Sequence, residues 1–203
     1  MKASLCLFAC VWSLPALAET APVISPQDSC CKAMEPAAFT TNSLYQAEVK
    51  FTDDNGKFFD PSYLRGRPVV LAMFFSSCGY ACPLIVSDMQ AIQAQLPESA
   101  RQSTAFVLVS FDTLRDSPEA LANYRKQRGL GERWTLLHGD NDSVRELAAL
   151  LGVKYKRETD GAYSHSNLIT VLNAEGEIVH QRDGLNGGVA AAATAVVAAQ
   201  KRR

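Results

Sequence analysis

The chain has 203 residues, with 47% hydrophobic residues, 20% charged residues and a net charge of -1 at pH 7. These values are typical of a globular protein with one compact domain. Because 20 Lys and Arg residues are balanced by 21 Asp and Glu residues, no positive surplus is available to neutralise phosphates. We therefore expect no nucleic-acid partner.

The first 18 residues have the pattern of a cleaved export signal. Lys2 is their only charged residue, an apolar stretch runs from Ala3 to Leu14, and Ala16-Leu17-Ala18 precedes Glu19. The apolar stretch is shorter than the ~20 residues that span a bilayer. We therefore predict removal of residues 1–18 and export to the periplasm. Membrane association is the alternative if the segment is retained.

Residues 19–42 are rich in Pro, Ser, Thr and Ala and show no apolar period, which predicts a flexible leader. The folded domain is then expected over residues 43–203. The leader contains Cys30, Cys31 and Met34, whose sulfur atoms suit a second site for a soft metal. Because a flexible segment offers no preorganised ligand geometry, we do not assign these residues to the main site.

The domain is predicted to begin with a β-hairpin over residues 47–59. Its turn contains Asn55-Gly56, a pair that tolerates the positive φ of a tight turn. Residues 69–75 form a continuous apolar run, which is typical of a central strand buried on both faces. Pro83 then suits the first turn of a helix, and apolar residues recur at helical spacing over residues 85–96.

Two further strand–helix units are predicted after this helix. Residues 105–111 repeat the buried-strand pattern, and Ser117 followed by Pro118 and Glu119 opens a helix. Residues 134–137 form a third short strand. Ser143, with Glu146 three residues later, predicts a capping box at the start of the next helix.

The last part of the chain is predicted to contain two strands and a helix. The strands cover residues 167–172 and 178–181, and an Ala-rich helix follows Gly188. The complete order predicts an α/β fold, with a mixed sheet flanked by helices and an N-terminal β-hairpin.

The segment SSCGYACP, residues 76–83, places Cys78 and Cys82 between a buried strand and a helix N-terminus. The partial positive charge of a helix start favours the thiolate and lowers the cysteine pKa. A thiolate is both a nucleophile for disulfide exchange and a ligand for a soft metal. A structural disulfide is the alternative, although so short a loop removes little entropy from the unfolded chain.

A histidine is the third residue of the predicted site. All nine prolines lie at or before Pro118, so the chain lacks the proline that faces the cysteines in redox-active thioredoxins. The segment Tyr163–Ser166 stands at that point and supplies His165. Two thiolates and an imidazole are ligand types that Cu(I) and Cu(II) accept, and zinc remains open on ligand chemistry alone. Cys78, Cys82 and His165 are therefore the predicted metal ligands.

These motifs resemble those of the Sco (SenC) family of copper-binding cytochrome oxidase assembly proteins. The resemblance covers roughly residues 45–185 and implies a thioredoxin-like fold. The matching segments are Cys78–Pro83 after a Phe-rich strand, Phe111-Asp112 with Arg115–Pro118 and Tyr124, Trp134–Leu137, and Ser164–Asn167. Two positions depart from the pattern of many members: Gly79 replaces a proline, and Ser164 replaces an aspartate that would supply negative charge near the metal.

The resemblance implies a copper metallochaperone and no enzymatic turnover. Such a protein takes copper, as Cu(I) or Cu(II), from a donor and delivers it to an apo cuproprotein, here the dinuclear copper centre of cytochrome c oxidase subunit II. The alternative is a thiol-disulfide oxidoreductase that depends on a thiol reductant. In that reading Cys78 attacks a disulfide of the recipient's copper site and Cys82 resolves the mixed disulfide. The added His165 favours metal binding over exchange.

Overall fold

The computed structural model describes residues 38–159 and 161–200. The predicted export signal and most of the predicted leader, with Cys30, Cys31 and Met34, lie outside the described residues. Within the described part, no helix has the length and apolar character needed to cross a membrane. The described domain begins at Ala38. Close to this start, the Thr40 hydroxyl donates a 2.8 Å hydrogen bond to the Glu177 carboxylate.

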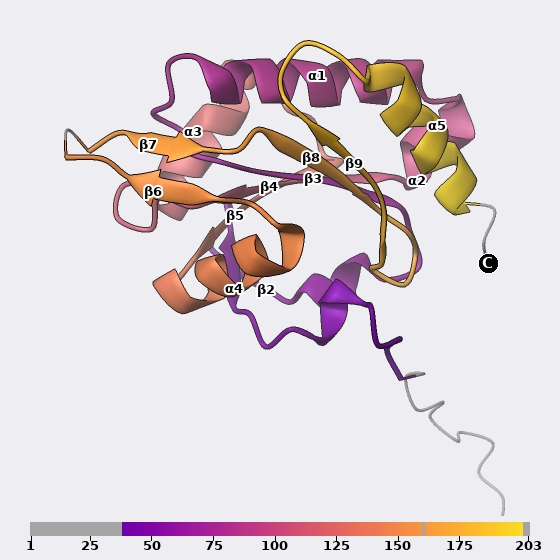
Figure 1. Ribbon diagram of the computed structural model, residues 1–203, viewed down its shortest axis with the longest axis horizontal. Coiled ribbons are helices and arrows are strands. Elements are labelled where there is room, and N and C mark those ends of the chain that lie inside the picture. The colour runs from indigo at the N-terminus through magenta and orange to yellow at the C-terminus, as the bar shows by residue number, and fades with distance from the viewer. Residues whose placement is uncertain (1–37, 160, 201–203) are drawn as a thin grey trace, which may run out of the picture. The chain divides into compact units, whose positions relative to one another are not determined.

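Seven strands form one mixed sheet in the order β2-β1-β5-β4-β3-β8-β9 (Figure 1). Strands β3, β4 and β5 are parallel to one another, and the other neighbouring pairs are antiparallel. The strands are β1 Phe51–Asp53, β2 Phe58–Phe59, β3 Val69–Phe74, β4 Ala105–Ser110, β5 Trp134–Gly139, β8 Leu168–Leu172 and β9 Ile178–Asp183. The predicted α/β fold with a mixed sheet is confirmed.

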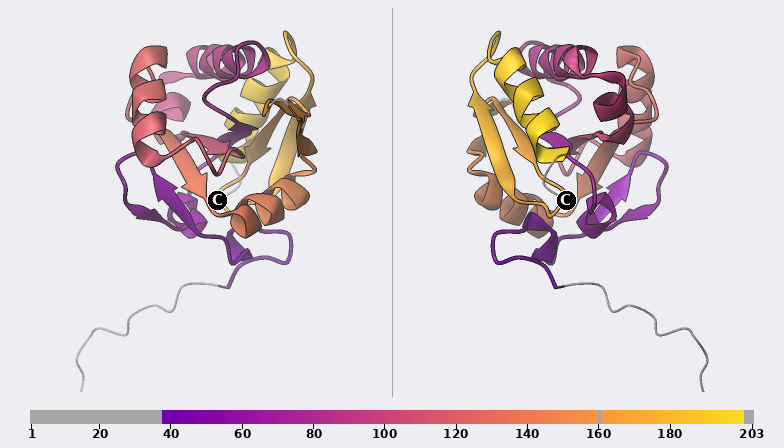
Figure 2. Two further views of the ribbon diagram at one scale, coloured as in Figure 1. Left: turned by 90° about the vertical axis from the view of Figure 1, so that its left-hand side faces the viewer. Right: turned by 90° about the vertical axis from the view of Figure 1, so that its right-hand side faces the viewer.

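Helices cover both faces of this sheet. Helices α1, α3 and α5 lie on one side and α4 lies on the other (Figures 1 and 2). The helices are α1 Ala81–Gln95, α2 Glu98–Ser103, α3 Pro118–Arg128, α4 Asn141–Leu151 and α5 Val189–Gln200, with 3-10 helices at Leu44–Gln46 and Pro61–Leu64. Because both faces are covered, the central strands have no solvent-facing side, and every residue of β3 and β4 is buried.

The N-terminal hairpin is confirmed, although its first strand is shorter than predicted. Strand β1 begins at Phe51 and pairs with β2 through a turn in which Gly56 has a φ of +78°. The capping box predicted at Ser143 is wrong, because α4 begins at Asn141 and is capped by Asp140. The Asp140 carboxylate accepts a 2.7 Å hydrogen bond from the Ser143 N–H, so the cap lies directly after β5.

A second, two-stranded sheet was not predicted from the sequence. Its strands are β6 Tyr155–Arg157 and β7 Tyr163–His165, which pair antiparallel. Their turn includes Gly161, which has a φ of +82°. This β6–β7 hairpin extends beyond the main sheet (Figure 1). Its strands are short and half exposed, so they lack the apolar run by which the buried strands are recognised.

Candidate metal centre

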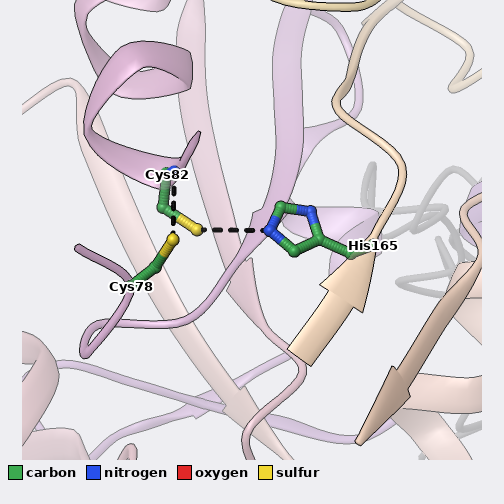
Figure 3. A group of neighbouring side chains, drawn as sticks. All are labelled: Cys78, Cys82 and His165. Carbon is green, nitrogen blue, oxygen red and sulfur yellow. Dashed lines mark hydrogen bonds between the residues drawn. The ribbon is translucent and has the colours of Figure 1, made fainter. Parts of the chain in front are cut away.

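Cys78 and Cys82 lie on the loop and the first helical turn that follow β3 (Figure 3). The Cys loop, residues 76–80, connects the buried β3 to α1, which begins at Ala81. Tyr80 stands at the N-cap position and makes no side-chain capping bond. Instead, the N–H of Cys82 donates to the Sγ of Cys78 over 3.4 Å. The Cys78 sulfur therefore caps the helix, and this bond favours its anionic form.

A buried carboxylate fixes the start of the Cys loop. Asp116 is 1% exposed and accepts hydrogen bonds from the N–H of Ser76 at 2.8 Å and from its hydroxyl at 2.5 Å. The hydroxyl of Ser110, at the end of β4, donates to the same carboxylate at 2.6 Å. Asp116 thus joins the Cys loop to the β4–α3 loop, residues 111–117. A buried carboxylate with this many donors holds its partners in one arrangement.

His165 is the last residue of β7, and its ring faces the two sulfur atoms (Figure 3). The Nδ1 atom lies 3.1 Å from the carbonyl oxygen of Ser166. Because a carbonyl only accepts hydrogen bonds, Nδ1 carries the proton in the neutral ring. The Nε2 lone pair is then directed at the Sγ of Cys82, at a distance of 3.8 Å.

Aromatic rings attach the β6–β7 hairpin to the domain. The His165 ring lies 5.9 Å from the ring of Phe75 and 5.1 Å from that of Phe111, measured between centroids. Phe111 also stacks on Tyr155, at 5.2 Å, and Tyr163 contacts Phe75 at 5.3 Å. Both strands of the hairpin therefore pack on residues that follow the central strands β3 and β4.

Arg115 adds a polar connection between the hairpin and the β4–α3 loop. Its Nη2 donates a 2.8 Å hydrogen bond to the carbonyl of Gly161, and its guanidinium lies 5.9 Å from the centre of the Tyr163 ring. Its Nε forms an ion pair with the carboxylate of Asp112, a residue with no exposed surface. The buried Asp112 thereby fixes the guanidinium that holds the hairpin turn.

The three sequence-predicted ligands are brought together by these contacts. The two sulfur atoms and a nitrogen of His165 all lie within 4.8 Å of one another. Within residues 38–159 and 161–200, no other group of three His, Cys, Asp or Glu side chains is arranged to hold a metal ion. Cys82 is completely buried, whereas Cys78 and His165 are half-buried, so solvent reaches the group at Cys78 and His165 but not at Cys82.

The two cysteines have opposite electrostatic environments. The hydrogen bond from the Cys82 thiol, with smaller contributions from the backbone N–H groups of Cys82 and Tyr80, lowers the pKa of Cys78 to about 4. The hydrogen bond that it gives to Cys78, together with burial, raises the pKa of Cys82 far above its usual value. The reduced pair is therefore one thiolate, Cys78, beside one protonated thiol, Cys82.

Ser164, the position at which the family resemblance implies an aspartate, faces solvent. Side chains alternate along a strand, so Ser164 lies on the opposite face of β7 from His165. Its hydroxyl donates a 2.7 Å hydrogen bond to Glu158, which also forms a 3.3 Å ion pair with Lys156. A carboxylate at position 164 would extend away from the sulfur atoms in this backbone. The departure at Ser164 therefore removes no direct contact with the ligands.

Sequence reasoning did not assign supporting roles to Asp112, Arg115 and Asp116. They belong to the segments that carry the family resemblance, and the sequence pattern predicts no further role for them. Strands β3 and β4 are parallel neighbours with Phe74 opposite Ser110, so the loops that follow them adjoin. The sequence signal for these supporting residues is a polar segment that directly follows the buried strand 105–111. Only the strand order shows that it lies beside the Cys loop.

The fold and the site define a thioredoxin-like protein with a Cys-Cys-His group at the end of its central strands. Residues 37–199 match the SCO1/SenC family, so the chain belongs to that family. A Stutzerimonas stutzeri protein described as a "putative copper-binding protein" is 29% identical over 135 residues, or 64% of this chain. The match spans 65% of that relative, just under two thirds of its length.

Solved structures of Sco proteins share the fold. The Arabidopsis thaliana ScoI structure with copper bound has a TM-score of 0.67 and 21% identity, over 76% of this chain and 97% of that one. The yeast Sco1 structure with copper bound has a TM-score of 0.64 and 21% identity, over 76% of this chain and 87% of that one. At these identities the likeness establishes the arrangement of helices and strands.

Proposed function

We propose that this protein binds one copper ion through the Sγ atoms of Cys78 and Cys82 and the Nε2 of His165, and delivers it to an apo cuproprotein. The observation that carries this proposal is the convergence of the three donor atoms within 4.8 Å on a group open at one side. Two sulfur atoms and one imidazole suit soft Cu(I) and are also accepted by Cu(II). The copper-binding description of the Stutzerimonas relative supports the choice of metal.

Each ligand has a distinct part in binding and release. Cys78 is already a thiolate, whereas Cys82 loses its proton when it becomes a ligand, so binding releases one proton at neutral pH. His165 offers a lone pair that the Ser166 carbonyl holds in place. Because Cys78 is more exposed than Cys82, an incoming ligand of the recipient replaces Cys78 first.

The proposed recipient rests on membership of the SCO1/SenC family, and the proposed compartment rests on the N-terminal sequence pattern. We propose cytochrome c oxidase subunit II as the recipient and its dinuclear copper centre as the destination. Export to the periplasm, after removal of residues 1–18, would place the protein in the compartment where that centre is assembled. The recipient is tested by the oxidase content of a strain that lacks this chain, and export is tested by mass spectrometry of the N-terminus of the protein isolated from the periplasm.

Copper titration of the reduced mature protein tests the ligand assignment. Wild type should bind one copper per chain, and the oxidised protein should bind almost none, because a disulfide removes both sulfur ligands. Cys78→Ser and Cys82→Ser should each abolish tight binding. The control is the double variant Cys30→Ser and Cys31→Ser, which should still bind one copper. Loss of binding in that control would contradict the assignment.

One observation favours a second function, thiol-disulfide exchange. A half-exposed thiolate beside a buried thiol is the arrangement in which one cysteine attacks and the other resolves. His165→Ala separates the two functions, since exchange requires Cys78 and Cys82 but not the imidazole. The variant should lose Cu(II) binding and keep its rate of disulfide reduction. Retained copper binding with lost exchange would favour the oxidoreductase.

A further inference from the structure

Two exposed apolar side chains lie on the loops that surround the candidate metal centre. Tyr80 is 73% exposed on the Cys loop, and Leu114 is 71% exposed on the β4–α3 loop. Among the described residues these are the two most exposed large hydrophobic side chains. Single exposed apolar residues are ordinary, but two on loops that are joined beside one candidate site call for an explanation.

The fold places these two loops beside each other. Both follow parallel neighbouring strands, β3 and β4, and the Asp116 carboxylate joins them through Ser76 and Ser110. Tyr80 is only two residues from Cys78, the partly exposed ligand, whereas Cys82 has no exposed surface. A protein that replaces Cys78 as a copper ligand therefore comes close to Tyr80.

Apart from the sulfur of Cys78, which becomes a copper ligand, the surface formed by these loops offers no unpaired charge. The Cys loop contains no Asp, Glu, Lys or Arg. In the β4–α3 loop, Asp112 and Asp116 are buried, and Arg115 is paired with Asp112. A partner that fits this surface has an uncharged, apolar rim around its own metal ligands, because a charged rim would lose hydration without gaining a counter-charge.

We propose that Tyr80 and Leu114 form a docking surface for the copper-accepting protein. This inference rests on the proposed function, and it identifies how the acceptor is recognised. Stable interfaces bury roughly 1,200–2,000 Å² in total, and two side chains supply only a small part of that area. The size therefore fits a brief transfer complex rather than a permanent dimer of this chain.

The test compares two double variants, each of which replaces two strongly exposed large hydrophobic residues. Tyr80→Ser with Leu114→Ser removes the docking surface. Phe58→Ser with Tyr63→Ser is the control, since Phe58 and Tyr63 are 61% and 60% exposed on β2 and the second 3-10 helix, outside the site. Each protein is loaded with one Cu(I) and mixed with the reduced apo copper domain of cytochrome c oxidase subunit II, or with bathocuproine disulfonate, a small chelator.

The docking variant should bind one copper and release it to the small chelator at the wild-type rate. Its second-order transfer to the protein acceptor should fall roughly tenfold or more, because aromatic and aliphatic anchors dominate small interfaces. The control variant should transfer copper as wild type does. Equal transfer by the docking variant and wild type would overturn the docking surface.

Other results separate this inference from the proposed function. A docking variant that no longer binds copper would show that these side chains retain the metal and do not recognise a partner. A variant whose rates of transfer to the chelator and to the protein both change by the same factor, relative to wild type, would show the same. A wild-type dimer that the docking variant converts to a monomer would identify a self-interface and overturn the inference. A wild type that binds copper but transfers none would overturn delivery itself, and the acceptor with it.

Discussion

The metal centre is built from two parts that are held in different ways. The Cys loop continues a strand in the middle of the main sheet, is fixed by a buried carboxylate, and leads into a helix whose first turn buries Cys82 completely. His165 comes from the β6–β7 hairpin, which lies outside the main sheet and is held by ring contacts and by Arg115. Backbone pairing and burial thus position the sulfur atoms, whereas side-chain contacts position the imidazole.

Because of this difference, His165 can change its position more easily than the two cysteines. Opening a half-exposed hairpin costs less free energy than moving a loop rooted in the core. A two-thiolate site can hold Cu(I) without a third ligand, whereas Cu(II) gains from the imidazole. We therefore expect changes near the Cys loop to affect binding of both oxidation states, and changes near the hairpin to affect mainly Cu(II).

Asp116→Ala should have the largest effect. The substitution leaves the Ser76 N–H and the Ser110 hydroxyl buried without their acceptor, and should lower the free energy of unfolding by roughly 3 kcal/mol. It should also weaken binding of both Cu(I) and Cu(II), because the Cys loop loses its anchor. Urea denaturation and copper competition measure the two effects. Asp116→Asn, which keeps one acceptor oxygen, should lose less of the free energy of unfolding and less of the copper affinity.

Arg115→Ala should release the hairpin and leave the Cys loop in place. Outer contacts of metal ligands contribute roughly 10–100-fold in affinity, so Cu(II) affinity should fall by about tenfold while Cu(I) affinity changes little. The visible spectrum of the Cu(II) form should change as well. The control is Arg101→Ala, because Arg101 pairs with Glu98 on the surface of α2. An equal loss of Cu(I) and Cu(II) affinity would mean that Arg115 supports the whole site.

The pH dependence of alkylation tests the thiolate. With the pKa of Cys78 lowered to about 4, iodoacetamide should modify it at a nearly constant rate from pH 8 to pH 5, and more slowly as the pH falls through about 4. In Cys82→Ala the main cause of the shift is gone, so the rate should already fall between pH 8 and pH 6.

The lowered pKa of Cys78 also makes the stability of the reduced protein depend on pH. The unfolded thiol has a pKa near its ordinary value of 9.0, so between about 4 and 9 unfolding takes up a proton at Cys78. Stability of the reduced protein should therefore rise with pH across this window, and the contribution of Cys78 should be lost below about pH 4. Cys78→Ser should remove this part of the pH dependence in denaturation experiments.

Ser164→Asp should have the smallest effect. The side chain faces solvent and meets Glu158 rather than the sulfur atoms. An exposed charge contributes little, so copper affinity should change by less than roughly threefold. A competition titration at two salt concentrations measures this change in copper affinity. A gain well beyond threefold would mean that β7 turns this side chain toward the metal when copper binds.

Much of the fold could be predicted because its centre has a strong local pattern. The apolar runs at 69–75 and 105–111 form the strands Val69–Phe74 and Ala105–Ser110, each one residue shorter than predicted, and Ser117 caps α3 as predicted. The β6–β7 hairpin could not be predicted, because its short, half-exposed strands are stabilised by distant rings such as Phe111. Long-range packing of this kind leaves no periodic signal in a single sequence.

The candidate site also has a part that could be predicted from the sequence and a part that could not. The two cysteines could be recognised from their place between a buried run and Pro83, and His165 from its position before a strand. Asp116 and Arg115 could not be assigned, because their partners Ser76 and Gly161 lie 40 and 46 residues away. Only the pairing of parallel strands and the fold of the hairpin bring them together.

X-ray absorption spectroscopy of the copper-loaded protein tests the central claim most directly, because it counts the sulfur and nitrogen ligands of each copper ion. Wild type, loaded with Cu(II), should show two sulfur ligands and one imidazole nitrogen from the protein. Cu(I)-loaded His165→Ala should keep both sulfur ligands and lose the imidazole signal. An imidazole that persists in His165→Ala, or a sulfur count that falls only when Cys30 and Cys31 are replaced, would contradict a centre formed by Cys78, Cys82 and His165.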